Sequence, residues 1–169
     1  LPGIEVNTEE EVRLLTCLAT VEAALEMGER LKAALPPTPD DSEIWGRQLT
    51  VDEDDEITGE KEKLLTGAVS LTIYEVDALC KQLGGIAIPA HVDKDSYSLL
   101  SVLGFAPEDL PCAAYEVARP EHTLQGLLDT GRLPAGCSLL TSSDAHQLDK
   151  IAEFPRELPE NSPIFQLLK

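Results

Sequence analysis

Hydrophobic residues near the start of the chain change from strand-like to helical spacing at Thr20. The segments 3–6 and 12–18 are mainly apolar and predict two strands, separated by an acidic stretch. After Thr20, apolar residues recur at helical spacing as far as Leu35, which predicts a helix with Thr20 as its N-cap. Two prolines follow Leu35 and end this helix, because proline lacks the backbone N–H that another helical turn requires.

A polar, irregular stretch at 40–67 precedes a second helix. Two short runs inside it, 48–52 and 56–58, can pair as a hairpin. The second helix begins after Thr72, where a glutamate three residues later completes a capping box. Its end lies at the glycine pair 84–85, because glycine readily adopts the left-handed backbone of a helix C-terminus.

The rest of the chain alternates short apolar runs with helical segments. This alternation predicts an α/β fold with parallel strands. The nearly continuous apolar character of the runs is typical of strands that are covered on both faces. The predicted strands are 86–90, 113–117 and 138–141, and the predicted helices are 96–103 and 123–128.

Composition fits one compact domain and argues against several classes of function. The chain has 169 residues, of which 43% are hydrophobic but only 4% aromatic, so aliphatic side chains must fill the core. We assign 1–152 to the domain and 153–169 to a Pro-rich C-terminal tail. A formal charge of −18, with no stripe of basic residues, argues against binding nucleic acid through a basic surface.

Cysteine spacing and the lack of targeting signals indicate a cytoplasmic protein. The four cysteines stand far apart without a CxxC pair, which argues against a zinc ribbon and favours reduced thiols. No apolar run approaches the ~20 residues that span a bilayer, and no signal-peptide pattern is present. Because the chain enters a strand at once without an initiator Met, we expect it to be part of a longer protein.

Two apolar strands each present one polar side chain that can carry chemistry. Glu5 lies between β-branched residues, where a buried charge is costly unless it is paired or bound to a metal. The alternative is an alternating strand with Glu5 facing water. His91 directly follows the run 86–90, and the carboxyl ends of parallel strands face the active site in α/β folds. A structural role for His91 is the alternative.

The last predicted strand ends in the sequence SSDAH, which is the strongest local pattern. Asp144 and His146 are two residues apart, so their side chains point to the same side of an extended backbone. A carboxylate and an imidazole side by side suit Zn²⁺, Mn²⁺ or Fe²⁺. The alternative is an Asx turn that opens the next segment. The remaining histidine, His122, lies at a predicted helix start and is interpreted as a surface or capping residue.

Taken in order, these strand ends resemble the later motifs of the PHP (polymerase and histidinol phosphatase) family of phosphoesterases. In that family a GIE strand, an AH strand end and an SDAH strand end each contribute metal ligands. The segments 46–62 and 86–105 also resemble a bacterial subgroup of predicted phosphoesterases, so the likeness extends over about 3–152. The matching residues are Gly3-Ile4-Glu5, Ala90-His91 and Ser143-Asp144-Ala145-His146.

The resemblance implies a fold, a cofactor and a reaction. The fold is a distorted (βα)₇ barrel, similar to a TIM barrel, with two or three divalent metal ions (Zn, Mn or Fe) at its C-terminal rim. Glu5 would bridge metals, and His91, Asp144 and His146 would ligate them. The implied reaction is hydrolysis of a small phosphate monoester or nucleotide-like substrate by water that the metals activate.

The chain departs from the family pattern in two ways. The HxH strand and Asp-His pair that precede the GIE strand in the family have no counterpart, so we expect a barrel incomplete at its N-terminal side. The chain alone should then be inactive or bind metal weakly. Arg13 stands where many relatives carry a metal-ligating histidine, and a guanidinium cannot ligate metal. It can bind substrate phosphate or pair with a nearby acid, and the abundance of carboxylates favours the ion pair.

Two competing functions remain at the level of sequence. One is a degenerate, non-catalytic PHP module, towards which Arg13 points. The other is a metal-dependent hydrolase that acts on another bond, such as an amide. Neither a P-loop nor a GxSxG elbow is present, so nucleophilic catalysis is not indicated. We also expect that the open strand edges of a partial barrel allow self-association.

Overall fold

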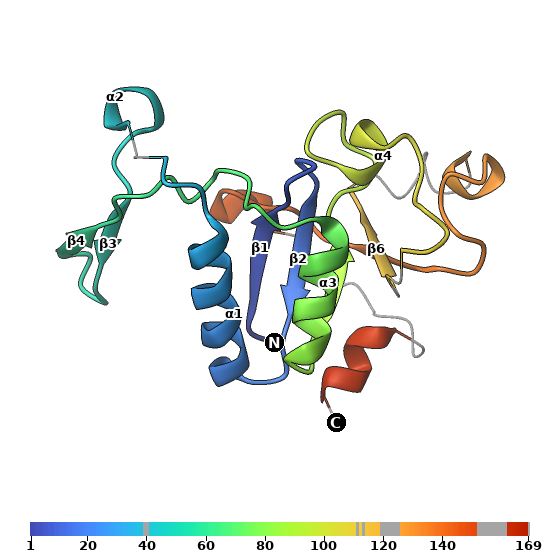
Figure 1. The fold of residues 1–169 in the computed structure, drawn as a ribbon, viewed down its shortest axis with the longest axis horizontal. Coiled ribbons are helices and arrows are strands. Elements are labelled where there is room, and N and C mark those ends of the chain that lie inside the picture. The colour runs from blue at the N-terminus through green and yellow to red at the C-terminus, as the bar shows by residue number, and fades with distance from the viewer. Residues whose placement is uncertain (39–40, 111, 113, 119–125, 152–161, 169) are drawn as a thin grey trace.

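A three-stranded antiparallel sheet lies at the centre of the structure (Figure 1). Its order is β1 (Gly3–Asn7), β2 (Arg13–Cys17) and β5 (Ile86–Pro89). The prediction of parallel strands is wrong for this sheet, since both neighbouring pairs run antiparallel. The connection from β1 to β2 is a tight turn, which only antiparallel neighbours permit. This computed structural model describes residues 1–38, 41–110, 112, 114–118, 126–151 and 162–168.

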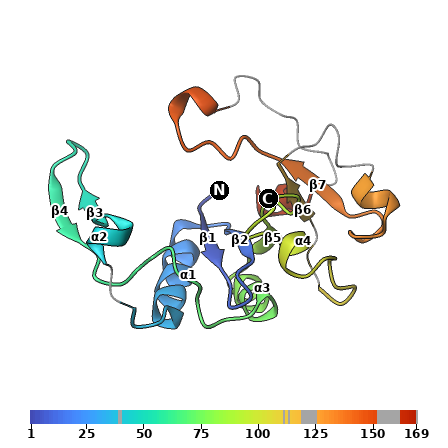
Figure 2. The same ribbon diagram turned by 90° about the horizontal axis from the view of Figure 1, so that it is seen from above.

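Helices α1 (Val21–Ala34) and α3 (Ile73–Gln82) cover one face of this sheet (Figures 1 and 2). We call this the outer face. The predicted N-cap of α1 is confirmed, because the Thr20 side chain accepts a hydrogen bond from the backbone N–H three residues later. The predicted capping box of α3 is also confirmed. Buried side chains from the sheet and both helices form the core, including Leu14 and Met27.

The polar stretch between α1 and α3 forms a separate projection (Figures 1 and 2). It contains the short helix α2 (Ser42–Trp45) and the strands β3 (Leu49–Val51) and β4 (Ile57–Glu60). The two strands are antiparallel, which confirms the predicted hairpin. Arg47 contacts the carboxylate of Glu60 at 2.8 Å and ties the hairpin base together.

β6 (Ala114–Val117) and β7 (Ser138–Thr141) form a parallel pair, as the alternation of elements predicts. Figure 2 shows them continuing the row of strands beyond β5. The short helix α4 (Leu99–Val102) is shorter than the predicted segment 96–103. The predicted helix 123–128 lies partly outside the described residues, and His122 lies wholly outside them.

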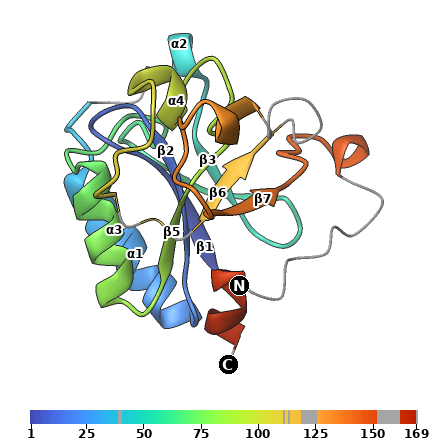
Figure 3. The ribbon, with the colours of Figure 1, turned by 90° about the vertical axis from the view of Figure 1, so that its right-hand side faces the viewer.

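The described residues form a mixed α/β fold, and their strands do not close into a barrel. The face opposite the helices, the inner face, carries a small apolar cluster of Ile88, Ala114 and Leu140. Ile164 packs against this cluster from the 3-10 helix η2 (Pro163–Leu168), which Figure 3 shows near the N-terminus. A second 3-10 helix, η1 (Leu148–Lys150), follows β7. None of the helices in these residues is long and apolar enough to cross a bilayer.

Candidate functional site

Three of the four predicted metal ligands lie just beyond the ends of β5 and β7. His91 follows β5, and Asp144 and His146 follow β7. These two strands lie on either side of β6, and the residues that follow each of them contact Glu116 near the end of that strand. The fold thus brings His91, Asp144 and His146 to the same edge, although they are far apart in sequence.

Left-handed backbone marks both strand ends. His91 has φ of 32° and Asp144 has φ of 45°. Side chains with a Cβ disfavour this region because the Cβ approaches the backbone carbonyl oxygen. Such conformations concentrate at functional sites, where the surrounding structure holds them in place. Glu11, Asp55 and Tyr97 also have positive φ, so this backbone supports His91 and Asp144 as site candidates only together with their place at the strand ends.

His91 offers a buried nitrogen that lacks a partner. The residue is only 3% exposed, and its backbone N–H donates to the Glu116 carboxylate at 2.9 Å. Its ring Nδ1 is buried and makes no hydrogen bond within the described part of the chain. Leaving such a group unsatisfied is unfavourable, so most buried polar atoms have a partner. The lone pair of an imidazole nitrogen can bind a metal ion, so a metal is one partner that would satisfy Nδ1.

Asp144 is held by a basic side chain of the same chain. The Lys94 ammonium donates a hydrogen bond to the Asp144 carboxylate and forms an ion pair with it. This bond lowers the pKa of Asp144 below its ordinary value, and the nearby His91 and His146 lower it further. His146 is exposed, with its Nδ1 3.0 Å from the Asp144 backbone oxygen.

Glu5 is paired with Arg13, which confirms the ion pair that we expected for that arginine. The guanidinium lies 3.1 Å from the Glu5 carboxylate, and both side chains are about one-third exposed, 34% and 39%. The pairing follows from the register, in which Glu5 faces Leu15 and Arg13 is the diagonal neighbour. Arg13 also lies over the Tyr97 ring, 5.1 Å from its centroid, a cation–π contact.

These residues provide suitable metal donors but not a complete metal site. Within the residues that the structure describes, no three His, Cys, Asp or Glu side chains are placed to hold a metal ion. Glu5 lies on β1, and β2, β5 and β6 lie between it and β7 (Figure 2). The unpartnered Nδ1 of His91 fits a metal, whereas the carboxylates of Glu5 and Asp144 are already paired with basic groups.

Sequence reasoning missed two residues at this edge, Glu116 and Lys94. Glu116 is 6% exposed, and its carboxylate accepts hydrogen bonds from the His91 N–H and the Ser142 hydroxyl. The signal was available, because Glu116 is a single acid within an apolar run, as Glu5 is. Lys94 carried no such signal, since it lies in a polar loop whose path the sequence pattern does not define.

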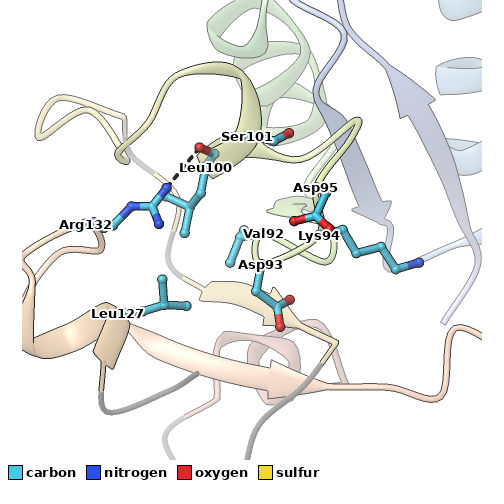
Figure 4. Close-up of a pocket in the computed structure, with 8 residues that line it drawn as sticks. All are labelled: Val92, Asp93, Lys94, Asp95, Leu100, Ser101, Leu127 and Arg132. Atoms are coloured by element: carbon cyan, nitrogen blue, oxygen red, sulfur yellow. Dashed lines mark hydrogen bonds between the residues drawn. The ribbon is translucent and has the colours of Figure 1, made fainter. Parts of the chain in front are cut away.

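A cavity of about 330 Å³ lies beside the loop that follows β5 (Figure 4). Its Arg132 guanidinium already has partners, because it donates to Leu100 O at 3.1 Å and to Gly104 O at 2.8 Å. The Lys94 side chain extends away from the cavity in Figure 4. The cavity is therefore a neighbour of the candidate site and not its centre. It is lined by Val92, Asp93, Lys94, Asp95, Leu100, Ser101, Leu127 and Arg132.

Comparisons with known proteins give one structural likeness. No family model matches the chain, and no curated protein matches it. The crystal structure of the lesion-specific endonuclease PfuEndoQ from Pyrococcus furiosus is similar, with a TM-score of 0.53 and 17% sequence identity. The match covers 85% of this chain and 30% of that chain, so this chain spans less than a third of its length. At this identity, the likeness shows that the fold resembles part of that endonuclease.

Proposed function

We propose that this chain is part of a PHP-like metal-dependent phosphoesterase, whose intact form hydrolyses a phosphate ester. The observation that carries the proposal is the buried, unpartnered Nδ1 of His91, at the edge that also presents Asp144 and His146. The structural likeness adds support, because an endonuclease hydrolyses phosphodiester bonds. Hydrolysis of a phosphate ester is thus the reaction that both the family resemblance and the structural likeness suggest.

In this proposal, His91, Asp144 and His146 would each contribute a ligand to a divalent cation at the ends of β5 and β7, although their present placement does not complete a metal site. Glu5 contributes a further carboxylate from β1, as the family resemblance implies. A divalent metal at such a site polarises the phosphoryl group and lowers the pKa of bound water. Arg13, which lies against Tyr97, keeps Glu5 oriented and places a fixed positive charge where a phosphate oxygen would be attracted.

A second candidate is a non-catalytic PHP-like module, and the two ion pairs favour it. Lys94 neutralises Asp144 and Arg13 neutralises Glu5, so internal cations occupy two carboxylates that would otherwise hold metal. Under this alternative, the ion pairs replace the metals as the groups that balance charge. The candidates differ in whether metal binds at all.

Mn²⁺ titration of the chain, followed by electron paramagnetic resonance, tests the proposal directly. We expect weak binding that His91→Ala abolishes, because this substitution removes the only buried imidazole among the described residues. Glu26→Gln, on the exposed surface of α1, serves as a matched control and should leave binding unchanged. Binding that His91→Ala does not affect would contradict the assignment of this residue.

Hydrolysis is then assayed with the full product of the gene that encodes this chain. p-Nitrophenyl phosphate and its bis-ester are incubated with Mn²⁺ or Zn²⁺, and release of p-nitrophenol is followed. We expect release that depends on the metal and is lost in His91→Ala. Metal binding without release from either ester would favour hydrolysis of another bond, and no metal binding would favour the non-catalytic module.

A further inference from the structure

One face of the β3–β4 hairpin is apolar and lies open to solvent. Val51 and Ile57 are direct partners across the hairpin, so their side chains lie on the same face. Leu49, two residues before Val51, shares that face because side chains alternate along a strand. The side chains of Leu49, Val51 and Ile57, which we call the hairpin face, are 39%, 52% and 59% exposed.

The other face of the hairpin is polar, so the apolar side chains are concentrated on one side. Thr50 and Thr58 lie on this polar face, where a hydrogen bond of 3.3 Å joins their hydroxyls. A two-stranded hairpin is only marginally stable alone in water, and an apolar face on it calls for another element to pack against. Exposed apolar patches with polar surroundings commonly mark sites of contact with other proteins.

Hydrogen bonds at its base hold the projection in a fixed position. The Gln48 side chain donates to the Lys63 backbone oxygen at 2.9 Å and accepts from the Leu65 N–H at 2.8 Å. The Lys63 ammonium donates to the backbone oxygen of Leu35, at the end of α1, at 3.4 Å. The hairpin face is therefore presented by an ordered element, which lowers the entropy that a contact there would cost.

The loop between β3 and β4 determines which charge a partner should carry. It consists of five consecutive acids, 52–56, all exposed. The Asp52 carboxylate accepts from two backbone N–H groups inside the loop, and no Lys or Arg among the described residues forms an ion pair with the other four acids. A second copy of this chain would bring the same loop and a charge of −18, so repulsion disfavours it as the partner.

We propose that the hairpin face is a docking surface for another protein, whose contact region has an apolar centre and a rim of Lys and Arg. The apolar centre covers Leu49, Val51 and Ile57, and the basic rim faces the acidic loop. Burial of apolar area supplies affinity, while charge complementarity selects the partner and speeds its association. Docking here does not depend on the proposed hydrolysis, because the projection lies on the opposite side of the molecule from β6 and β7 (Figures 1 and 2).

A fluorescein-labelled peptide tests this surface on the whole chain. The centre of the peptide alternates leucine and threonine, so an extended backbone gives it one apolar face, and both of its ends are lysines. Fluorescence anisotropy should show saturable binding that weakens as NaCl is raised, because salt screens the charges. A peptide with glutamates at its ends, and another with serine in place of leucine, should each bind at least about tenfold more weakly.

A double substitution tests the apolar part of the surface. Val51→Thr with Ile57→Thr makes the hairpin face polar but keeps β-branched side chains, which favour strands. We expect the affinity for the lysine peptide to fall about tenfold, since apolar contact area is lost. Leu148→Thr with Ile151→Thr is the matched control, because both residues are exposed and lie outside the projection, and affinity should stay unchanged.

A second pair of variants tests the charge of the loop. Glu53→Gln with Asp54→Asn should weaken binding of the lysine peptide by about threefold at low salt, because exposed charge pairs contribute modestly. Glu9→Gln with Glu22→Gln removes the same charge from exposed acids outside the projection and should change the affinity far less. An equal loss in both double variants would show that overall charge, and not the loop, attracts the peptide.

Hydrogen exchange measures docking without any substitution. With saturating lysine peptide, we expect the amides of β3 and β4 to exchange about tenfold more slowly, while the amides of α3 keep their rates. Unchanged exchange in the hairpin, equal binding of the glutamate peptide, or full affinity in Val51→Thr with Ile57→Thr would overturn the proposal. Sedimentation velocity gives a further outcome: association of copies that this double variant abolishes, without peptide binding, would make a second copy the partner and reject a basic one.

Discussion

At the scale of single residues, internal cations balance the two carboxylates that we propose as metal ligands. Lys94 pairs with Asp144 and Arg13 pairs with Glu5, and all four side chains are partly exposed, from 26% to 39%. Ion pairs with this much exposure are weak, because water screens both charges. A divalent cation can therefore displace the basic group, and its apparent affinity includes the free energy of breaking the pair.

Lys94→Met should consequently tighten Mn²⁺ binding. The ammonium no longer competes for the Asp144 carboxylate, and exposed pairs are worth up to ~1 kcal/mol, which corresponds to at most about fivefold in affinity. Calorimetric titration of the chain measures the change. Lys150→Met is the matched control, since Lys150 pairs with the exposed Asp149 outside the site. Equal or weaker binding by Lys94→Met would show that Lys94 does not compete with metal.

Cys80 should be the least reactive thiol in the native chain. It is fully buried at 0% exposure, and burial raises the pKa of its thiol to about 12. Thiolate is the reactive species, so very little of it is present at neutral pH. Alkylation with iodoacetamide, followed by mass spectrometry, should label Cys80 far more slowly in buffer than in urea. Equal alkylation rates in buffer and in urea would mean that the core between the sheet and its two helices opens readily.

At the scale of elements, the boundaries of α3 depend on a local hydrogen-bond pattern. The Thr72 N–H donates to the Glu75 carboxylate at 2.8 Å, and the Glu75 N–H donates to the Thr72 hydroxyl at 3.3 Å. The hydrogen bond from the Thr72 backbone N–H lowers the pKa of the Glu75 carboxyl below its ordinary value of 4.5, and the bond from the Thr72 hydroxyl lowers it further. Such a box is visible in the sequence because it involves residues only three apart.

Loss of this capping box should destabilise the chain in a pH-dependent way. Thr72→Ala should lower the free energy of unfolding by about 1 kcal/mol at neutral pH. Because the pKa of Glu75 is lower in the folded state, its contribution is complete above 4.5 and disappears as pH falls through the folded value. Urea unfolding at pH 7 and pH 3 measures the free energy of unfolding of the unaltered chain and of Glu75→Gln. The difference between these two free energies should be smaller at pH 3 than at pH 7. A difference that does not change with pH would contradict the role of Glu75 in the capping box.

Strand direction was the element-scale feature that sequence patterns misjudged. The alternation of apolar runs with helical segments predicted parallel strands, but it does not take account of how short each connection is. The short turn between β1 and β2 required an antiparallel pair, and β5 then joined the other side of β2 in the same manner. Among the strand ladders of the described residues, the pair β6 and β7 is the one that follows the predicted parallel arrangement.

At the scale of the whole molecule, an open sheet edge and a large negative charge have opposite effects on self-association of the chain. β1 forms a ladder only with β2 among the described residues, and an apolar groove of about 520 Å³ lies between β1 and α1. Val21 and Leu25 line this groove and are 59% and 67% exposed. Exposed edges and apolar surface favour association, whereas a charge of −18 opposes it.

Salt should therefore promote self-association of the chain. At low ionic strength we expect monomers, and at ~0.1 M salt the Debye length falls to about 10 Å, so repulsion between copies weakens. Sedimentation velocity at low and high NaCl measures the shift. Val21→Lys with Leu25→Lys should prevent it, because these residues are exposed and contribute to the groove. Association that persists in the double variant would place the contact elsewhere.

The sequence alone determined the features that depend on neighbouring residues. The helices after Thr20 and Thr72, the hairpin and the strand ends at His91 and Asp144 could be predicted because caps, turns and apolar periodicity act over a few positions. The abundance of carboxylates near Arg13 predicted an ion pair for that arginine, but only the strand register identified Glu5 as its partner.

Only the tertiary structure decided how those pieces meet. Which strands are neighbours, which acid holds His91 and which lysine neutralises Asp144 depend on contacts between residues 25 to 50 positions apart. No periodicity of the chain encodes such distances, because they result from packing the helices and strands around a shared core. For the same reason Glu116, the residue that links both strand ends, emerged from the fold and not from a motif.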